Sequence, residues 1–166
     1  MQKSERETPY FIGQPGVPWG ETEKAAWLAV QKIQRSYQAN VVSEIDKLAG
    51  RFDVEQYNTL EYSNLTGENY PLFAVKSRHW VVNRPIVLIT GGVHGYETSG
   101  VHGALRFIQE HLEHYSQFFN IVVAPCLSPW GYETINRWNP NAVDPNRSFY
   151  EASPSAEACH LMSYVH

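Results

Sequence analysis

A histidine and a glutamate stand one helical turn apart in the stretch IVLITGGVHGYETSG, residues 86–100. His94 and Glu97 follow a short apolar run that ends in Thr90 and two glycines. Side chains at positions i and i+3 share one face of a helix, so both could bind a single ion. Imidazole and carboxylate are ligands of Zn²⁺, which in catalytic sites takes three protein ligands and a water. A metal-free turn, in which Glu97 favours the positive helix N-terminus, would show the same spacing.

A second group of polar residues lies within RWNPNAVDPNRSF, residues 137–149. The guanidinium group is a planar fork that matches a carboxylate in two-point contact. Asn146 and Arg147 are therefore candidates to hold a free carboxylate, such as the C-terminus of a peptide. Arg137 is a candidate to polarise the scissile carbonyl and stabilise the developing oxyanion. A loop held together by hydrogen bonds from arginine to carbonyl groups is the alternative explanation.

The strand pattern predicts an α/β fold that would bring these two groups together. Short apolar runs predict buried strands at 86–89 and 121–124, the first of them in the middle of a sheet. Its carboxyl end is where open α/β sheets bind ligands. Strands within 52–62 and at 72–75 are expected to pair as a ribbon at one side. The expected fold is a mixed, mostly parallel central sheet with helices on both faces, incomplete in this chain.

Apolar residues at steps of three and four predict two helices, and Ser153-Pro154 marks the start of a third. The first is expected to run from Glu21 to Gly50, and the last over Ser155–Tyr164. The second follows Glu97, and its buried face comprises Val101, Ala104, Leu105, Ile108, Leu112 and Tyr115. Residues 127–150 are predicted to form a long irregular loop, a length usually associated with function. We expect an irregular leader at 1–20 and the N-terminal portion of a single catalytic domain at 21–166.

Composition and charge exclude several classes of protein. The chain is 43% hydrophobic and 18% charged, as in folded globular proteins. A net charge of -4 without a basic run gives no indication of nucleic-acid binding. No apolar run is long enough to cross a membrane. Two cysteines and an N-terminus without an apolar core predict a reduced, cytoplasmic protein, while the oligomeric state stays unknown.

The combination of motifs resembles the zinc carboxypeptidase family, peptidase family M14. The segment SPWGY, residues 128–132, is similar to the Asn-Pro-Asp-Gly-Tyr type loop of that family. The likeness spans about residues 85–149 and depends on three motifs in order: His94-x-x-Glu97, Arg137, and Asp144-x-Asn146-Arg147-x-Phe149. Because the motifs occur together, they are far more specific than any one of them alone.

This resemblance implies a function for each candidate residue. His94 and Glu97 would bind one zinc ion, and Arg137 would help to polarise the carbonyl. Asn146 and Arg147 would bind the terminal carboxylate of a peptide, or of a small amide substrate. The implied activity is zinc-dependent hydrolysis of the C-terminal peptide bond.

Departures from the family pattern leave two alternatives open. The second place of the Asp-Leu-Asn-Arg motif is Pro145, and the family's third zinc ligand, general-base glutamate and substrate-capping tyrosine have no counterpart. Neither His160 nor His166 is expected to be the third ligand. We therefore expect an N-terminal part of a longer enzyme, inactive when isolated. One alternative is a deacylase of N-acylated amino acids, of the aspartoacylase or succinylglutamate desuccinylase type, and the other is a non-catalytic binding remnant.

Overall fold

The structure is a computed structural model that describes residues 12–166, in two compact units divided between Gln31 and Lys32. The described part of the first unit holds one helix, α1 (Glu21–Ala29), whose Glu23 carboxylate accepts a hydrogen bond from the Gly20 amide at 2.9 Å. Residues 12–20 form bends and turns, and the rest of the predicted leader lies outside the described residues. The domain limits at 1–20 and 21–166 stay predictions.

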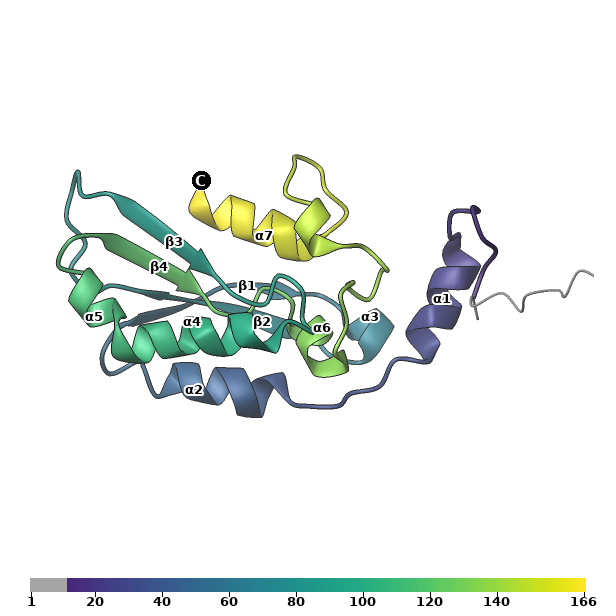
Figure 1. Ribbon diagram of the computed structural model, residues 1–166, viewed down its shortest axis with the longest axis horizontal. Helices are drawn as coiled ribbons and strands as arrows, with labels where there is room; N and C mark the ends of the chain where they lie inside the picture. The colour runs from purple at the N-terminus through teal and green to yellow at the C-terminus, as the bar shows by residue number, and fades with distance from the viewer. Residues whose placement is uncertain (1–11) are drawn as a thin grey trace, which may run out of the picture. The chain divides into compact units, whose positions relative to one another are not determined.

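A four-stranded mixed sheet forms the centre of the second unit (Figure 1). The strand order is β1-β2-β4-β3. The pairs β1–β2 and β2–β4 are antiparallel, and β3–β4 is parallel. The predicted mixed sheet and the predicted ribbon of the first two strands are confirmed. The expectation that the sheet is mostly parallel is wrong for the described residues, because two of their three strand pairs are antiparallel. The strands are β1 (Asp53–Leu60), β2 (Tyr70–Lys76), β3 (Ile86–Thr90) and β4 (Asn120–Ala124).

Helices cover both faces of this sheet (Figure 1). α4 (Thr98–Glu110) packs on β3 and β4, whereas α7 (Ala156–Val165) lies on the opposite face against β1. The remaining helical turns of the unit are short: η1 (Gln38–Val42), α2 (Ser43–Asp46), α3 (Ser63–Thr66), α5 (Leu112–Tyr115), α6 (Pro129–Thr134) and η2 (Pro145–Arg147). The predicted apolar face of α4 is buried, and Leu112 with it, but Tyr115 is 43% exposed. The predicted helix at 155–164 is confirmed as α7.

The predicted single helix from Glu21 to Gly50 is wrong. Residues 30–36 are not helical, and the helix resumes as η1 and α2. Ser36 begins this second helix, because its hydroxyl accepts a hydrogen bond from the Ala39 amide at 3.0 Å. The Arg35 side chain donates to the carbonyl groups of Gly95 and Tyr132, which are distant in sequence. If residue 35 were part of a helix, its side chain would not reach these groups in the same way. The spacing of apolar residues continues at steps of three and four through the non-helical residues 30–36. Periodicity alone therefore did not predict the break.

The predicted position of strand 86–90 is also wrong within the described residues. β3 is at one edge of the sheet, and Ile86 and Leu88 are 64% and 41% exposed. β4, by contrast, is buried along its whole length, as predicted. A short apolar run predicts a strand but does not indicate whether that strand lies in the middle or at the edge of a sheet.

The segment 127–150 is more regular than predicted. Every residue of α6 is buried, and η2 forms a single 3₁₀ turn.

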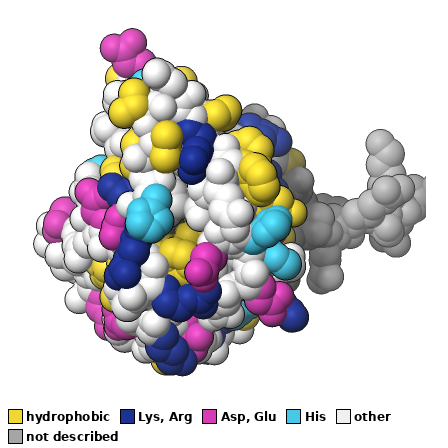
Figure 2. Space-filling view, turned by 90° about the vertical axis from the view of Figure 1, so that its left-hand side faces the viewer, with side chains coloured by type: hydrophobic (Ala, Val, Ile, Leu, Met, Phe, Trp, Pro, Cys, Tyr) yellow, Lys and Arg dark blue, Asp and Glu magenta, His cyan; other side chains and the backbone are white. Residues whose placement is uncertain are grey.

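Acidic and basic side chains are interspersed with apolar ones on the face of the molecule shown in Figure 2. Among the helices of the described residues, none is both long enough and apolar enough to cross a bilayer.

Candidate metal and carboxylate site

Glycines place His94 in a tight turn between β3 and α4. A Cβ atom on Gly91 would lie 2.5 Å from the Pro125 carbonyl oxygen, and Gly92 has a φ of +58°. At Gly95 the turn meets α6 backbone to backbone, since a Cβ atom there would lie 1.8 Å from the carbonyl carbon of Gly131. Only glycine fits these positions, so the chain reverses sharply and buries the imidazole.

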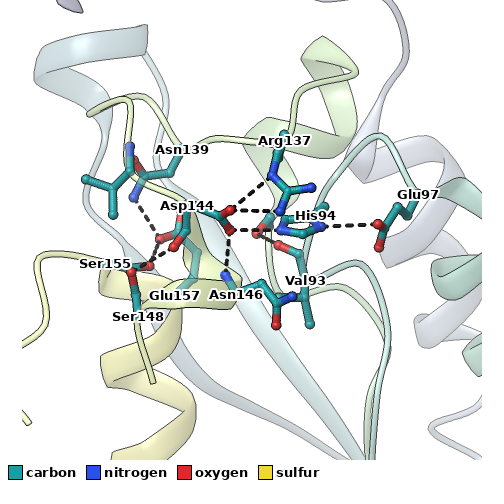
Figure 3. A network of polar contacts seen from close by, with 12 residues as sticks. Val93, His94, Glu97, Arg137, Asn139, Asp144, Asn146, Ser148, Ser155 and Glu157 are labelled. Carbon is teal, nitrogen blue, oxygen red and sulfur yellow. Dashed lines mark hydrogen bonds and ion pairs between the residues drawn. The ribbon is translucent and has the colours of Figure 1, made fainter. Parts of the chain in front are cut away.

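The His94 ring contacts a carboxylate on each side (Figure 3). Its Nδ1 is 3.1 Å from Oε1 of Glu97, and its Nε2 is 2.8 Å from Oδ1 of Asp144. The residue is 3% exposed, whereas the Glu97 side chain is 50% exposed. The ring of Tyr96 stacks on the imidazole, with centroids 5.8 Å apart. His94 is therefore fixed in orientation, while its Nδ1 side faces an accessible carboxylate.

Asp144 connects His94 to the predicted arginine. Its Oδ2 accepts a hydrogen bond from Nε of Arg137 at 3.0 Å. The same oxygen forms an ion pair with Nη2 of that guanidinium, also at 3.0 Å. Its Oδ1 also accepts from the Asn146 amide at 3.0 Å. Burial raises the pKa of Asp144, but the hydrogen bonds from His94, Arg137 and this amide lower it more, so the net pKa is below its ordinary value. The carboxylate is thus ionised at neutral pH and holds three groups of the site.

A buried carboxylate on α7 supports the loop that carries Arg137 and Asp144 (Figure 3). Glu157 is 2% exposed and accepts hydrogen bonds from the Tyr62 hydroxyl at 2.8 Å, Nδ2 of Asn139 at 3.0 Å and the Ser155 hydroxyl at 2.7 Å. Burial and the nearby Glu157 raise the pKa of Tyr62 far above its ordinary value, so this hydroxyl remains a donor.

Asn139 transmits this support to the backbone of the loop. Its Oδ1 accepts hydrogen bonds from the amides of Asn141 and Val143, both at 3.1 Å. These bonds close the turn that lies between Arg137 and Asp144. The relative position of the two charged residues is therefore set from α7.

The structure brings four of the five predicted site residues close together. Figure 3 shows His94, Arg137 and Asn146 around Asp144, with Glu97 on the far side of the His94 ring. The fifth, Arg147, is exposed and follows Asn146 in η2. Arg137 is less free than expected, because its guanidinium binds Asp144 and its Nη1 donates to the Tyr96 hydroxyl at 3.3 Å.

Sequence reasoning missed the role of Asp144 as the common partner of His94 and Arg137. The local signals were its place at the start of the Asp144-x-Asn146-Arg147 motif and its position before Pro145, which is typical of the residue that caps a short helical turn. The contacts of Tyr96 and Glu157 had no local signal. Each joins segments that are distant in the chain.

Two of the donors that zinc needs are present and fit it. When Nε2–H donates to Asp144, the lone pair of Nδ1 is left for a cation, as in the carboxylate–histidine–zinc arrangement. Ligand atoms about 2.0–2.1 Å from one tetrahedral zinc ion are separated by about 3.3 Å. The 3.1 Å between His94 Nδ1 and Glu97 Oε1 agrees with that separation. Asp144 is on the other side of the ring, and residues 12–166 contain no group of three or more His, Cys, Asp or Glu placed to hold a metal.

Comparisons with known proteins identify the family and the fold of this chain. A family model described as zinc carboxypeptidase matches residues 65–161, more than half of the chain. A candidate metallopeptidase of Shewanella amazonensis is 25% identical, with a TM-score of 0.61 over 75% of this chain and 47% of its own. One of Shewanella denitrificans is 22% identical, with a TM-score of 0.61 over 78% of this chain and 45% of its own.

A candidate carboxypeptidase of Burkholderia mallei shares the fold at 17% identity, with a TM-score of 0.59 over 90% of this chain and 36% of its own. No curated protein sequence matches the chain. The chain thus spans less than half the length of these solved structures.

Proposed function

This chain belongs to the zinc carboxypeptidase family, and we propose that it carries the zinc-binding and carboxylate-binding part of a metallocarboxypeptidase site. His94 and Glu97 bind the metal ion, Arg137 contacts the scissile carbonyl, and Asn146 and Arg147 hold the terminal carboxylate. The substrate is a peptide with a free C-terminus. Further ligands of the ion are expected from outside the described residues.

One observation carries the proposal, the different environments of the two His94 nitrogens. Nε2 is occupied by Asp144 at 2.8 Å, while Nδ1 faces the half-exposed carboxylate of Glu97 at 3.1 Å. Hydrogen bonding of one nitrogen to a carboxylate raises the basicity of the other and orients the ring for a metal. A histidine that served only to stabilise the turn would not need a second carboxylate, 50 positions later in the chain, on its far side.

The remaining residues would bind and orient the substrate. A zinc ion bound at this site supplies Lewis acidity to a carbonyl group and to a water molecule. Asp144 holds the Nε and Nη2 side of Arg137, which leaves Nη1 on the side of the Tyr96 hydroxyl. A substrate carbonyl would replace that hydroxyl as the partner of Nη1. Asn146 and Arg147 are exposed and can donate to a carboxylate without breaking a buried contact.

Zinc titration of the chain, by competition with a chromophoric chelator, tests the metal site. We expect binding of one ion with modest affinity, because residues 12–166 provide only two of the protein ligands. His94→Ala and Glu97→Gln should each weaken binding at least about tenfold. His111→Ala is the matched control, since His111 is an exposed histidine at the end of α4. Equal affinity in all four proteins, or no binding, would contradict the proposal.

Ligand binding by NMR tests the carboxylate site separately. A short peptide with a free C-terminus should bind more tightly than the same peptide with a C-terminal amide. Arg147→Gln should remove this preference, whereas the control Arg106→Gln should not, because Arg106 pairs with Glu110 on α4. Equal binding of both peptides to the unsubstituted chain would show that no carboxylate clamp exists here.

A further inference from the structure

We propose that Arg35 is a positioning residue for the turn that carries His94 and Glu97. Arg35 belongs to the non-helical segment 30–36, which the sequence pattern had assigned to a helix. The inference rests on the proposed function, because the turn matters for chemistry only if its side chains bind a metal ion.

The guanidinium of Arg35 joins the turn to α6. Nη2 donates to the Gly95 carbonyl oxygen at 2.9 Å, Nη1 to the Thr98 hydroxyl at 2.6 Å, and Nε to the Tyr132 carbonyl oxygen at 2.5 Å. The same group lies over the Tyr132 ring, 4.0 Å from its centroid. Three acceptors from two segments thus meet one rigid, planar donor.

The residues that Arg35 contacts are themselves held in place. Tyr132 is 1% exposed, and its hydroxyl accepts a hydrogen bond from Nδ2 of Asn40 at 3.3 Å. Gly95 and Gly131 pack with their backbones in contact. Any sliding of the turn along α6 would therefore break hydrogen bonds and create a backbone clash.

The contacts of Arg35 act on both candidate ligands through their neighbours in the chain. His94 directly precedes Gly95, and Glu97 directly precedes Thr98. The Thr98 hydroxyl also donates to the Tyr96 carbonyl oxygen at 3.3 Å, which closes the turn between them. Arg35 thereby sets the separation of the two side chains that must share one ion. Lysine cannot reproduce this function, because its single ammonium group has no fixed fork.

Two measurements on the zinc-free and zinc-titrated chain test the proposal. In Arg35→Met we expect the Tyr96 and Glu97 amides to exchange hydrogen at least about tenfold faster relative to the β4 amides. Zinc affinity should fall about tenfold or more, as when outer partners of metal ligands are removed. Arg35→Lys should not restore either value. Thr98→Val, which keeps Arg35, should show a smaller change in the same direction, and Thr98→Ser none.

Arg51→Met is the matched control. Arg51 also donates to a carbonyl group, that of Gln109 at 3.1 Å, and lies over an aromatic ring, that of Phe52 at 5.0 Å, but it has no contact with the turn. Its loss should leave the exchange at Tyr96 and Glu97 unchanged.

The two measurements separate failure of the inference from failure of the proposed function. If the unsubstituted chain binds no zinc, the proposed function is wrong, and the exchange data alone decide whether Arg35 holds the turn. If the chain binds zinc but Arg35→Met matches Arg51→Met in both measurements, the inference is overturned. If Arg35→Met does not fold, the comparison of Thr98→Val with Thr98→Ser decides: equal exchange and affinity in these two variants would overturn the inference.

Discussion

His94 donates through Nε2 to Asp144 at 2.8 Å, across 50 positions of sequence. This contact joins the turn after β3 to the loop before η2. It also connects the imidazole to Arg137, since both bind the same carboxylate. A single acidic residue therefore helps to orient both a candidate metal ligand and a candidate substrate-binding arginine.

Replacing Asp144 by Asn should weaken zinc binding about 10–100-fold. The amide can still accept a hydrogen bond from Nε2, but it carries no charge, so Nδ1 becomes a weaker donor to the metal. Zinc competition titrations measure the change. The control is Asp46→Asn, an exposed carboxylate at the end of α2. Affinity in Asp144→Asn within about twofold of the unsubstituted chain would remove this role for Asp144.

The same carboxylate should make stability depend on pH in the acidic range. The pKa of Asp144 is lowered from 3.8 in the folded state, so around that pH the unfolded chain binds more protons. The contribution of the ionised group to the free energy of unfolding is complete above the ordinary pKa and is lost as pH falls through the lowered one. Urea unfolding of the unsubstituted chain and of Asp144→Asn should give a stability difference that shrinks as pH falls below 3.8. A difference that is constant or grows on acidification would contradict this assignment.

Gly95→Ala should destabilise the fold by about 3 kcal/mol or more, or prevent folding. The added Cβ atom would lie 1.8 Å from the carbonyl carbon of Gly131 and 2.0 Å from the Tyr132 amide nitrogen, and neither backbone can move aside cheaply. Gly103→Ala is the control, because a Cβ atom there meets nothing within 4 Å. In the middle of α4 it should stabilise by about 0.5–1 kcal/mol. Urea unfolding that ranks the two variants in the opposite order would refute the close approach.

Local sequence signals predicted those features that depend on near neighbours. Alternation and short apolar runs located the four strands, steps of three and four residues located α4, and the start signal at Ser153-Pro154 located α7. The spacing of His94 and Glu97 predicted that their side chains meet, and their atoms are 3.1 Å apart, although both residues precede α4 instead of sharing a face of it. These predictions were right because each feature is specified by a single segment of the chain.

Features that depend on distant segments could not be predicted in the same way. At the break before η1, Arg35 binds Gly95 and Tyr132, and no pattern around residue 35 contains that information. The exposure of Ile86 depends on which strands flank β3, not on the strand itself. The contact between His94 and Asp144 likewise needed the whole sheet and loop to be placed.

Glu157→Gln should destabilise the chain by about 1–3 kcal/mol, because a buried carboxylate that accepts three hydrogen bonds would be replaced by a group with one acceptor oxygen. The new amide nitrogen would replace one carboxylate oxygen, so either the Tyr62 hydroxyl, or Nδ2 of Asn139 together with the Ser155 hydroxyl, would lose its acceptor. Because Asn139 holds the Val143 amide at 3.1 Å, hydrogen exchange at Val143 should accelerate more than exchange in β4.

The exposed Glu151→Gln provides the control for this substitution, and it should change neither unfolding nor exchange. Tyr62→Phe removes one of the three donors and should have a smaller effect than Glu157→Gln. The free energy of unfolding of Glu157→Gln could lie within about 0.5 kcal/mol of that of the unsubstituted chain, with hydrogen exchange at Val143 unchanged. In that case α7 does not support the Arg137–Asp144 loop. The geometry of that loop would then depend on its own turn and on the contact with His94.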